Sequence, residues 1–165
     1  PVDPFGLVPI HSHATYGMYE VLAAYGLATN DGLIPELREG VRWIPSAATD
    51  LFFVTLNKSD EDYSPTTRYE DYPISPTLFH WESQSKTTQR STTGQRYINH
   101  VARGSRVMLF VRENKQDERD VSAPYLCLGP ARYVRHESER PIRIVWELER
   151  PMPAEIYQHA KVAAG

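Results

Sequence analysis

Cysteine is nearly absent from this sequence of 165 residues, and long apolar runs are absent altogether. The single cysteine, Cys127, excludes an internal disulfide and every zinc module built on several cysteines. No apolar run approaches the roughly 20 residues of a membrane span, and the N-terminus lacks the basic start of a signal peptide. These absences predict an intracellular protein with no membrane partner. Because the chain begins at Pro1 without a methionine, we expect a piece of a longer protein.

The signatures of common enzymes are also missing. The sequence has no GxSxG nucleophile elbow, no Walker A loop and no GxGxxG motif. His80-Trp81-Glu82 matches the H-x-E half of a zinc deaminase, but the P-C-x-x-C half that would hold the metal is absent. We therefore predict no catalytic residue, no metal and no cofactor. One alternative stays open, a metal-dependent nuclease or base-processing enzyme centred on Glu113 and Lys115 or on His80 and Glu82.

Acidic residues are missing from one long segment. Between Ser83 and Arg112 there is no Asp or Glu, although the whole chain has a net charge of −3. The segment carries six cations: Lys86, Arg90, Arg96, Arg103, Arg106 and Arg112. Serine, threonine and glutamine are interleaved with them, which is the mixture of side chains that contacts phosphate oxygens. The segment predicts a basic nucleic-acid-binding face, with a merely solvated surface as the alternative.

The rest of the sequence is a series of short runs rich in β-branched and aromatic residues. They predict strands at residues 41–44, 50–56, 77–83, 107–113, 125–134 and 142–149. Helices are expected at residues 16–26, at 93–102 with Thr93 as cap and Gly104 as end, and at 154–164 as a short helix or tail. This pattern predicts a mainly β, α+β fold: a small, strongly curved sheet or barrel with a short N-terminal helical appendage.

The expected domain organisation follows from the same pattern. Residues 1–39 form a helical segment and linker, residues 40–153 the main domain, and residues 154–165 a short helix or tail. Near position 80, strand alternation places Phe79 and Trp81 on one face and His80 and Glu82 on the other. Phe79 favours the core, whereas Trp81 is equally compatible with the core and with a platform that faces a ligand.

Several motifs in one order resemble a known family. They are residues 51–60 (LFFVTLNKSD), 64–75 (SPTTRYEDYPIS), 78–84 (LFHWESQ), 94–100 (GQRYINH), 109–113 (LFVRE), 125–130 (YLCLGP) and 150–153 (RPMP). Over about residues 40–153, with a looser similarity in the helix around residues 16–26, the chain closely resembles a domain of unknown function that ends many bacterial superfamily-2 helicases carrying a phospholipase-D-type nuclease. Such proteins act in modification-dependent (type IV) restriction, and the terminal domain is similar to SET-and-RING-associated (SRA-like) readers of 5-methylcytosine.

The resemblance implies a PUA-like β-barrel that flips a modified cytosine out of double-stranded DNA into an aromatic pocket. It also implies nuclease and helicase domains in the parent chain, and the bacterial cytoplasm as location. The implied base pocket contains Tyr69, Asp71, Tyr72, Trp81, Ser83 and Gln84. The implied contacts to the DNA backbone are Lys58, Ser64, Thr66, Arg68, Lys86, Arg90, Gln95, Arg96 and His100.

Each pocket residue has an expected role. Trp81 with Tyr69 or Tyr72 would sandwich the flipped base, and Asp71 would accept a hydrogen bond from its N4 amino group. Ser83 or Gln84 would address the remaining Watson–Crick edge. Flipping costs a few kcal/mol, which stacking of about 1 to 3 kcal/mol per base and phosphate contacts can offset. An RNA-binding PUA-like module is a further alternative, because a fold alone does not fix a function.

Overall fold

The computed structural model describes residues 8–27, 40–57 and 71–165. In chain order its elements are β1 (Thr15–Tyr16), α1 (Met18–Ala24), β2 (Val41–Ile44), a 3-10 turn (Pro45–Ala47), β3 (Thr49–Thr55), β4 (Tyr72–Pro73), β5 (Leu78–Glu82), α2 (Thr92–Ile98), α3 (His100–Arg103), β6 (Arg106–Arg112), β7 (Tyr125–Glu137), β8 (Arg143–Leu148) and α4 (Ala154–Ala163). All six strands predicted from the sequence are present, with their ends shifted by at most three residues. The mainly β, α+β class is confirmed.

The strands form one mixed sheet in the order β2-β3-β6-β7-β8-β5-β4, with β1 paired to β7. All pairs of strands are antiparallel except β3 and β6, which are parallel. The sheet does not close, so the prediction of a barrel is wrong. Within the described residues, β2 and β4 lie at the two ends of the order and each pairs on one side only.

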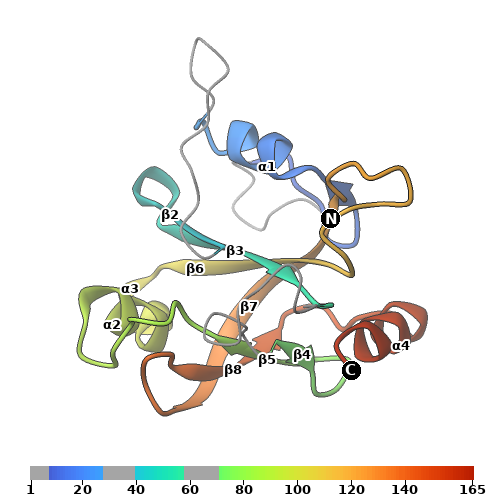
Figure 1. The fold of residues 1–165 in the computed structure, drawn as a ribbon. Helices are drawn as coiled ribbons and strands as arrows, with labels where there is room; N and C mark the ends of the chain where they lie inside the picture. The colour runs from blue at the N-terminus through green and yellow to red at the C-terminus, as the bar shows by residue number, and fades with distance from the viewer. Residues whose placement is uncertain (1–7, 28–39, 58–70) are drawn as a thin grey trace.

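A bend in β7 divides the sheet into two layers. The first half of β7 pairs with β6 and the second half with β8, and Ala131 pairs with both neighbours. Register shifts leave Leu128 and Val134 as extra residues, and such bulges increase the local bend and twist of a strand. In Figure 1, β2, β3 and β6 form the upper layer, and β7 passes from it to β8, β5 and β4 below.

The main core lies between these two layers. Phe52 of β3 and Trp81 of β5 are stacked with ring centroids 4.0 Å apart and planes at 5°. Tyr97 of α2 meets both rings edge-on, at 5.4 and 5.3 Å. Phe79 and Trp146 are fully buried in the same cluster, which confirms the prediction that Phe79 is a core residue.

A second core lies on the other face of β3 and β6, beneath α1 (Figure 1). Because side chains alternate along a strand, Phe52 points into the main core while Leu51 points into the second core. Val21 and Leu22 of α1 cover that second face. The helical segment predicted as an appendage therefore packs directly on the sheet.

The ends of α2 and α3 partly match the prediction. Gly104 ends α3 with a φ of +71°, as expected for a glycine at a helix C-terminus. The predicted cap, Thr93, is wrong, because the hydroxyl of Ser91 accepts the hydrogen bond from the N–H of Gly94 at 3.0 Å. At the C-terminus, α4 is a regular helix. No helix in the described ranges is long and apolar enough to cross a membrane.

Gly94 marks the closest approach of α2 to the preceding loop. A Cβ atom at this position would lie 2.1 Å from the carbonyl oxygen of Thr88 and 3.0 Å from Ile142. We expect Gly94→Ala to lower the free energy of unfolding by about 1 to 3 kcal/mol, because the backbone of the loop must move. Urea denaturation measures the change. Thr92→Ala, an exposed position on the same helix, is the control and should stay within about 0.5 kcal/mol of wild type.

Candidate nucleic-acid interface

Two segments far apart in the sequence are joined by hydrogen bonds into one surface, which we call the rim: residues 84–91 before α2 and residues 138–141 in the β7–β8 turn. The backbone N–H of Gln89 donates to Glu139 Oε2 at 3.1 Å, and its side-chain amide donates to the carbonyl of Ser138 at 2.9 Å. The backbone N–H of Arg140 donates to the carbonyl of Thr87 at 2.9 Å. These hydrogen bonds hold the two segments side by side, so that they form one surface.

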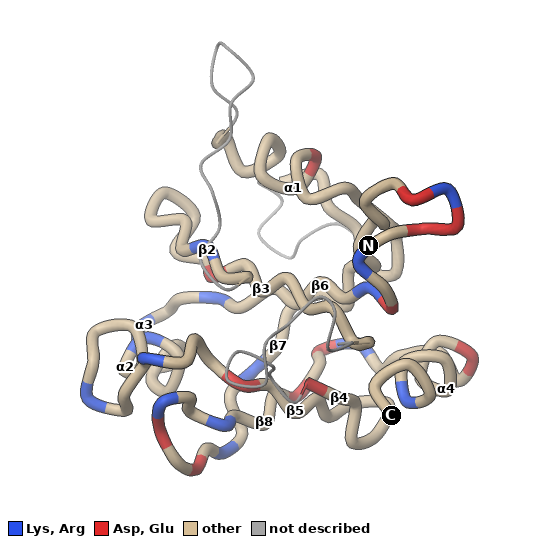
Figure 2. Tube along the Cα trace, in the orientation of Figure 1, with Lys and Arg blue, Asp and Glu red and all other residues tan. Residues whose placement is uncertain are grey.

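The rim carries three cations and one anion, Glu139, whose carboxylate accepts from the backbone N–H of Gln89. Lys86, Arg90 and Arg140 are exposed, and their side chains have no ion pair or hydrogen bond within the described ranges. Arg103, at the end of α3, is likewise exposed and unpaired there. Figure 2 shows Lys and Arg on the loop before α2, and both Lys or Arg and Asp or Glu on the β7–β8 turn. The sequence analysis did not single out Arg140, because Glu137 and Glu139 lie beside it and cancel its charge in the net charge of that segment.

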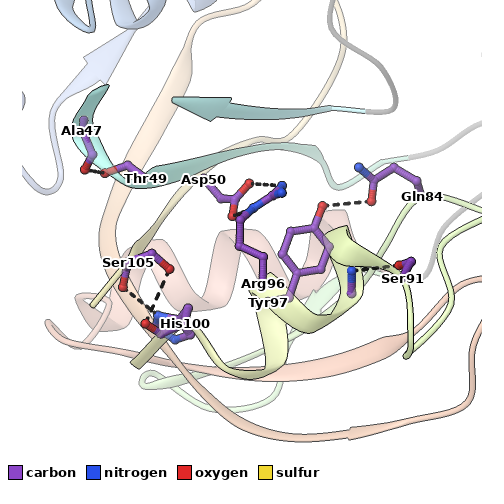
Figure 3. Close-up of polar contacts among 10 residues, drawn as sticks. Ala47, Thr49, Asp50, Gln84, Ser91, Arg96, Tyr97, His100 and Ser105 are labelled. Carbon is purple, nitrogen blue, oxygen red and sulfur yellow. Dashed lines mark hydrogen bonds and ion pairs between the residues drawn. The ribbon is translucent and has the colours of Figure 1, made fainter. Parts of the chain in front are cut away.

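Arg96 has a different environment from these cations. Its guanidinium donates to both carboxylate oxygens of Asp50, at 2.8 and 2.9 Å (Figure 3). It also lies 4.5 Å from the ring centroid of Trp43. The Asp50 side chain is fully buried and that of Arg96 is 15% exposed. Burial raises the pKa of Asp50, and the charge and hydrogen bonds of Arg96 oppose that shift. This placement does not support the prediction that Arg96 holds a phosphate, because the guanidinium already neutralises a buried carboxylate.

His100 and Gln95 were also predicted to contact the DNA backbone. In His100, Nδ1 lies 3.1 Å from the carbonyl of Ser105 and must donate, while Nε2 accepts from the backbone N–H of Tyr133 at 3.0 Å. The side-chain amide of Gln95 donates to the carbonyl of Gln89, and its oxygen accepts from Asn99. Both side chains therefore stabilise α2 and its surroundings, and His100 is buried.

Gln84 is a polar residue of the rim, and hydrogen bonds to its side-chain oxygen fix the orientation of its amide. Its Oε1 accepts from the hydroxyl of Tyr97 at 3.0 Å (Figure 3) and from that of Thr87 at 3.2 Å. Two donors on the oxygen identify the other terminal atom as the amide nitrogen, which carries two N–H groups. No partner for that nitrogen occurs among the described residues, and the side chain is partly exposed. Gln84 therefore has hydrogen-bond donors that no described residue uses.

Ser83, the alternative to Gln84 in the predicted pocket, is only 1% exposed. Its hydroxyl accepts from the backbone N–H of Ile142 at 2.8 Å and donates to the carbonyl of Gln84 at 3.1 Å. The donor of this hydroxyl is thus already used inside the protein. Of the two residues, the geometry favours Gln84 for contact with a ligand.

The remaining pocket residues are placed as follows. Asp71 is buried, and its Oδ1 accepts from the backbone N–H of Glu82 at 3.0 Å. Tyr72 is exposed and stacks on His80 with ring centroids 4.5 Å apart. Trp81 is 4% exposed in the main core, where Phe52 covers one face of its indole. Five predicted residues lie outside the described ranges: Lys58, Ser64, Thr66, Arg68 and Tyr69.

The enzymatic alternative has two possible centres, His80 with Glu82 and Glu113 with Lys115, and the structure places them on different elements. His80 and Glu82 are buried in β5, while Glu113 lies 3.5 Å from His159 of α4. Lys115 is exposed. Throughout residues 8–27, 40–57 and 71–165, no three His, Cys, Asp or Glu side chains come together as a metal site would require.

Comparison with known families identifies the chain as a member of one of them. Residues 11–160 match the family described as Domain of unknown function (DUF3427), and the chain therefore belongs to that family. The match includes α1, where the sequence resemblance is looser, in agreement with the packing of α1 on the sheet. It also extends past residue 153 into α4. No curated protein sequence matches the chain.

The effect of an alanine substitution on stability should differ between Arg96, which pairs with the buried Asp50, and a cation of the exposed rim. Arg96→Ala leaves a fully buried carboxylate without a counter-ion, so we expect a loss of about 3 to 5 kcal/mol in unfolding free energy. Arg90→Ala, on the exposed rim, should change it by less than about 0.5 kcal/mol. Thermal and urea denaturation measure both. Equal stability of the two variants would contradict this assignment.

His100 predicts a fall in stability at mildly acidic pH. Burial lowers the pKa of His100, and the positive charge of Arg132 acts in the same direction. The unfolded chain therefore binds a proton at this histidine more readily than the folded chain does. The free energy of unfolding has its full value above the ordinary histidine pKa of about 6.5 and decreases as the pH falls below it. In urea denaturation between pH 7.5 and 5.5, His100→Gln should flatten this decrease. Parallel curves for wild type and variant would exclude His100 as its source.

Proposed function

We propose that this chain is a DNA-binding reader of modified cytosine and that the rim contacts the DNA backbone. The observation that carries the proposal is the set of exposed rim cations, Lys86, Arg90 and Arg140, which have no ion pair or hydrogen bond in the described ranges, together with the Gln84 amide, whose donors no described residue uses. Cations without internal partners can bind phosphates without first breaking an ion pair. The proposal extends to the parent protein, a modification-dependent restriction protein of the bacterial cytoplasm in which nuclease and helicase domains cleave and move DNA.

Gln84 supports the choice of base. The Watson–Crick edge of cytosine has one donor, the N4 amino group, and two acceptors, N3 and O2. An amide nitrogen fixed by Tyr97 and Thr87 offers donors to those acceptors, and Asp71 would accept from N4. An extruded base would stack on Tyr69, and Trp81 would support the site from the core. Tyr72 stacks on His80 on the other face of β5 and is not part of this site.

The proposal is tested with one duplex in unmodified, 5-methyl and 5-hydroxymethyl forms at several salt concentrations. We expect a modified form to bind more tightly than the unmodified form. Arg90→Ala and Arg140→Ala should each weaken all forms alike and flatten the log–log salt dependence by about one. Equal affinity for the three forms would refute the reading of modified cytosine, and a salt slope near zero would refute the rim as the DNA surface.

Gln84→Glu is the sharpest variant for base recognition. It keeps an acceptor for Tyr97 and Thr87 but removes the N–H donors, so the ratio of modified to unmodified affinity should fall about tenfold. The glutamate also adds a negative charge, which weakens binding of the modified and the unmodified duplex alike. The ratio of the two affinities therefore reports on base recognition rather than on charge. Gln158→Glu, an exposed position on α4, is the matched control. Stronger competition by structured RNA than by modified duplex would favour an RNA-binding module instead.

A further inference from the structure

A hollow of about 250 Å³ lies on the face of the lower layer that points away from the main core. A row of residues directly opposite one another on four neighbouring strands crosses it: Tyr72 of β4, His80 of β5, Val145 of β8 and Arg135 of β7. Arg143 and Glu137, which pair with each other across β8 and β7, form the next row on the same face. The hollow is thus built on the rigid sheet and is separate from the rim.

One wall of this hollow is an aromatic platform. The Tyr72 ring is stacked on the His80 imidazole with planes at 10°, and Tyr72 remains 40% exposed. A flat ring held in this way can stack on a planar ligand with little loss of side-chain freedom.

The polar groups of the hollow include both a cation and an anion that have no internal partner. Arg135 and Glu137 are exposed, lie two residues apart on the same face of β7, and form no ion pair or hydrogen bond within the described part of the chain. Arg143 differs, because its Nε lies 3.3 Å from Glu82 Oε1. The Glu137 carboxylate would repel a bare phosphate and can only accept hydrogen bonds. The ligand should therefore offer hydrogen-bond donors as well as acceptors.

We propose that the hollow binds an unpaired guanine base. Guanine has two adjacent acceptors, O6 and N7, which match the donor fork of Arg135. It also has two adjacent donors, N1–H and the N2 amino group, which match the carboxylate of Glu137. No other base of DNA offers both pairs. In a duplex the N1–N2 edge is paired with cytosine, so the base must come from a free nucleotide or from a single strand.

This inference stands on the hollow itself and goes beyond the proposed reading of modified cytosine. It is tested by following the amide resonances of the protein while dGMP, dAMP, dCMP, dTMP or inorganic phosphate is added. We expect dGMP to bind at least about fivefold more tightly than the other nucleotides. Glu137→Gln and Arg135→Lys should abolish that preference, and Tyr72→Ala should weaken every nucleotide. Arg132→Lys is the matched control on β7, because Arg132 pairs with Glu147 and does not line the hollow.

The source of the guanine is tested separately with a thymine oligonucleotide that contains one guanine. Tighter binding of this oligonucleotide than of dGMP would identify a single strand as the ligand, and the reverse result a free nucleotide. Equal binding of the four nucleotides, displacement of dGMP by phosphate, or no dGMP binding at about 10 mM would overturn the inference. Arg90→Ala should not change dGMP binding, so failure of the hollow is distinguishable from failure of the rim.

Discussion

The stacked contact between Phe52 and Trp81 is the constraint on which the rest of this fold depends. Their strands, β3 and β5, are four steps apart in the sheet, which in a flat sheet would separate them by about 19 Å. The rings instead lie 4.0 Å apart. Only a sheet bent back on itself allows this distance, and β7 supplies the bend where Leu128 and Val134 interrupt its pairing. The open sheet thereby gains an enclosed core without closing into a barrel.

Helix α2 connects that core to the candidate interface. Tyr97 meets both stacked rings edge-on, and its hydroxyl donates to Gln84. The residue before it, Arg96, binds the buried Asp50 of β3. One turn of helix therefore fixes the upper layer through an ion pair and the rim through a hydrogen bond. The orientation of the Gln84 amide therefore depends on how the aromatic core packs.

Sequence reasoning succeeded where the signal was local. Strand positions follow from runs of β-branched and aromatic residues, and the burial of Phe79 follows from alternation. The polar sequence neighbours of Trp81 suggested a ligand, but the ring contacts Phe52, which is distant in sequence. Gly129, with a φ of +85°, follows the bulge at Leu128, but the bulge at Val134 has no such glycine, so the open form of the sheet could not be predicted. The hollow beside Tyr72 combines four strands and was equally inaccessible from sequence.

The basic segment shows why composition overstates a binding surface. Its six cations would correspond to a salt slope of roughly 5.4 if each bound one phosphate. Arg96 instead neutralises Asp50, and Arg112 donates to Thr55 and lies over the ring of Tyr125. Within the segment, Lys86, Arg90 and Arg103 are exposed and have no ion pair or hydrogen bond in the described ranges, and together with Arg140 of the rim they correspond to a salt slope of roughly 3.6. A protein that uses arginine both to stabilise its core and to bind phosphate must be assessed from the partners of each guanidinium.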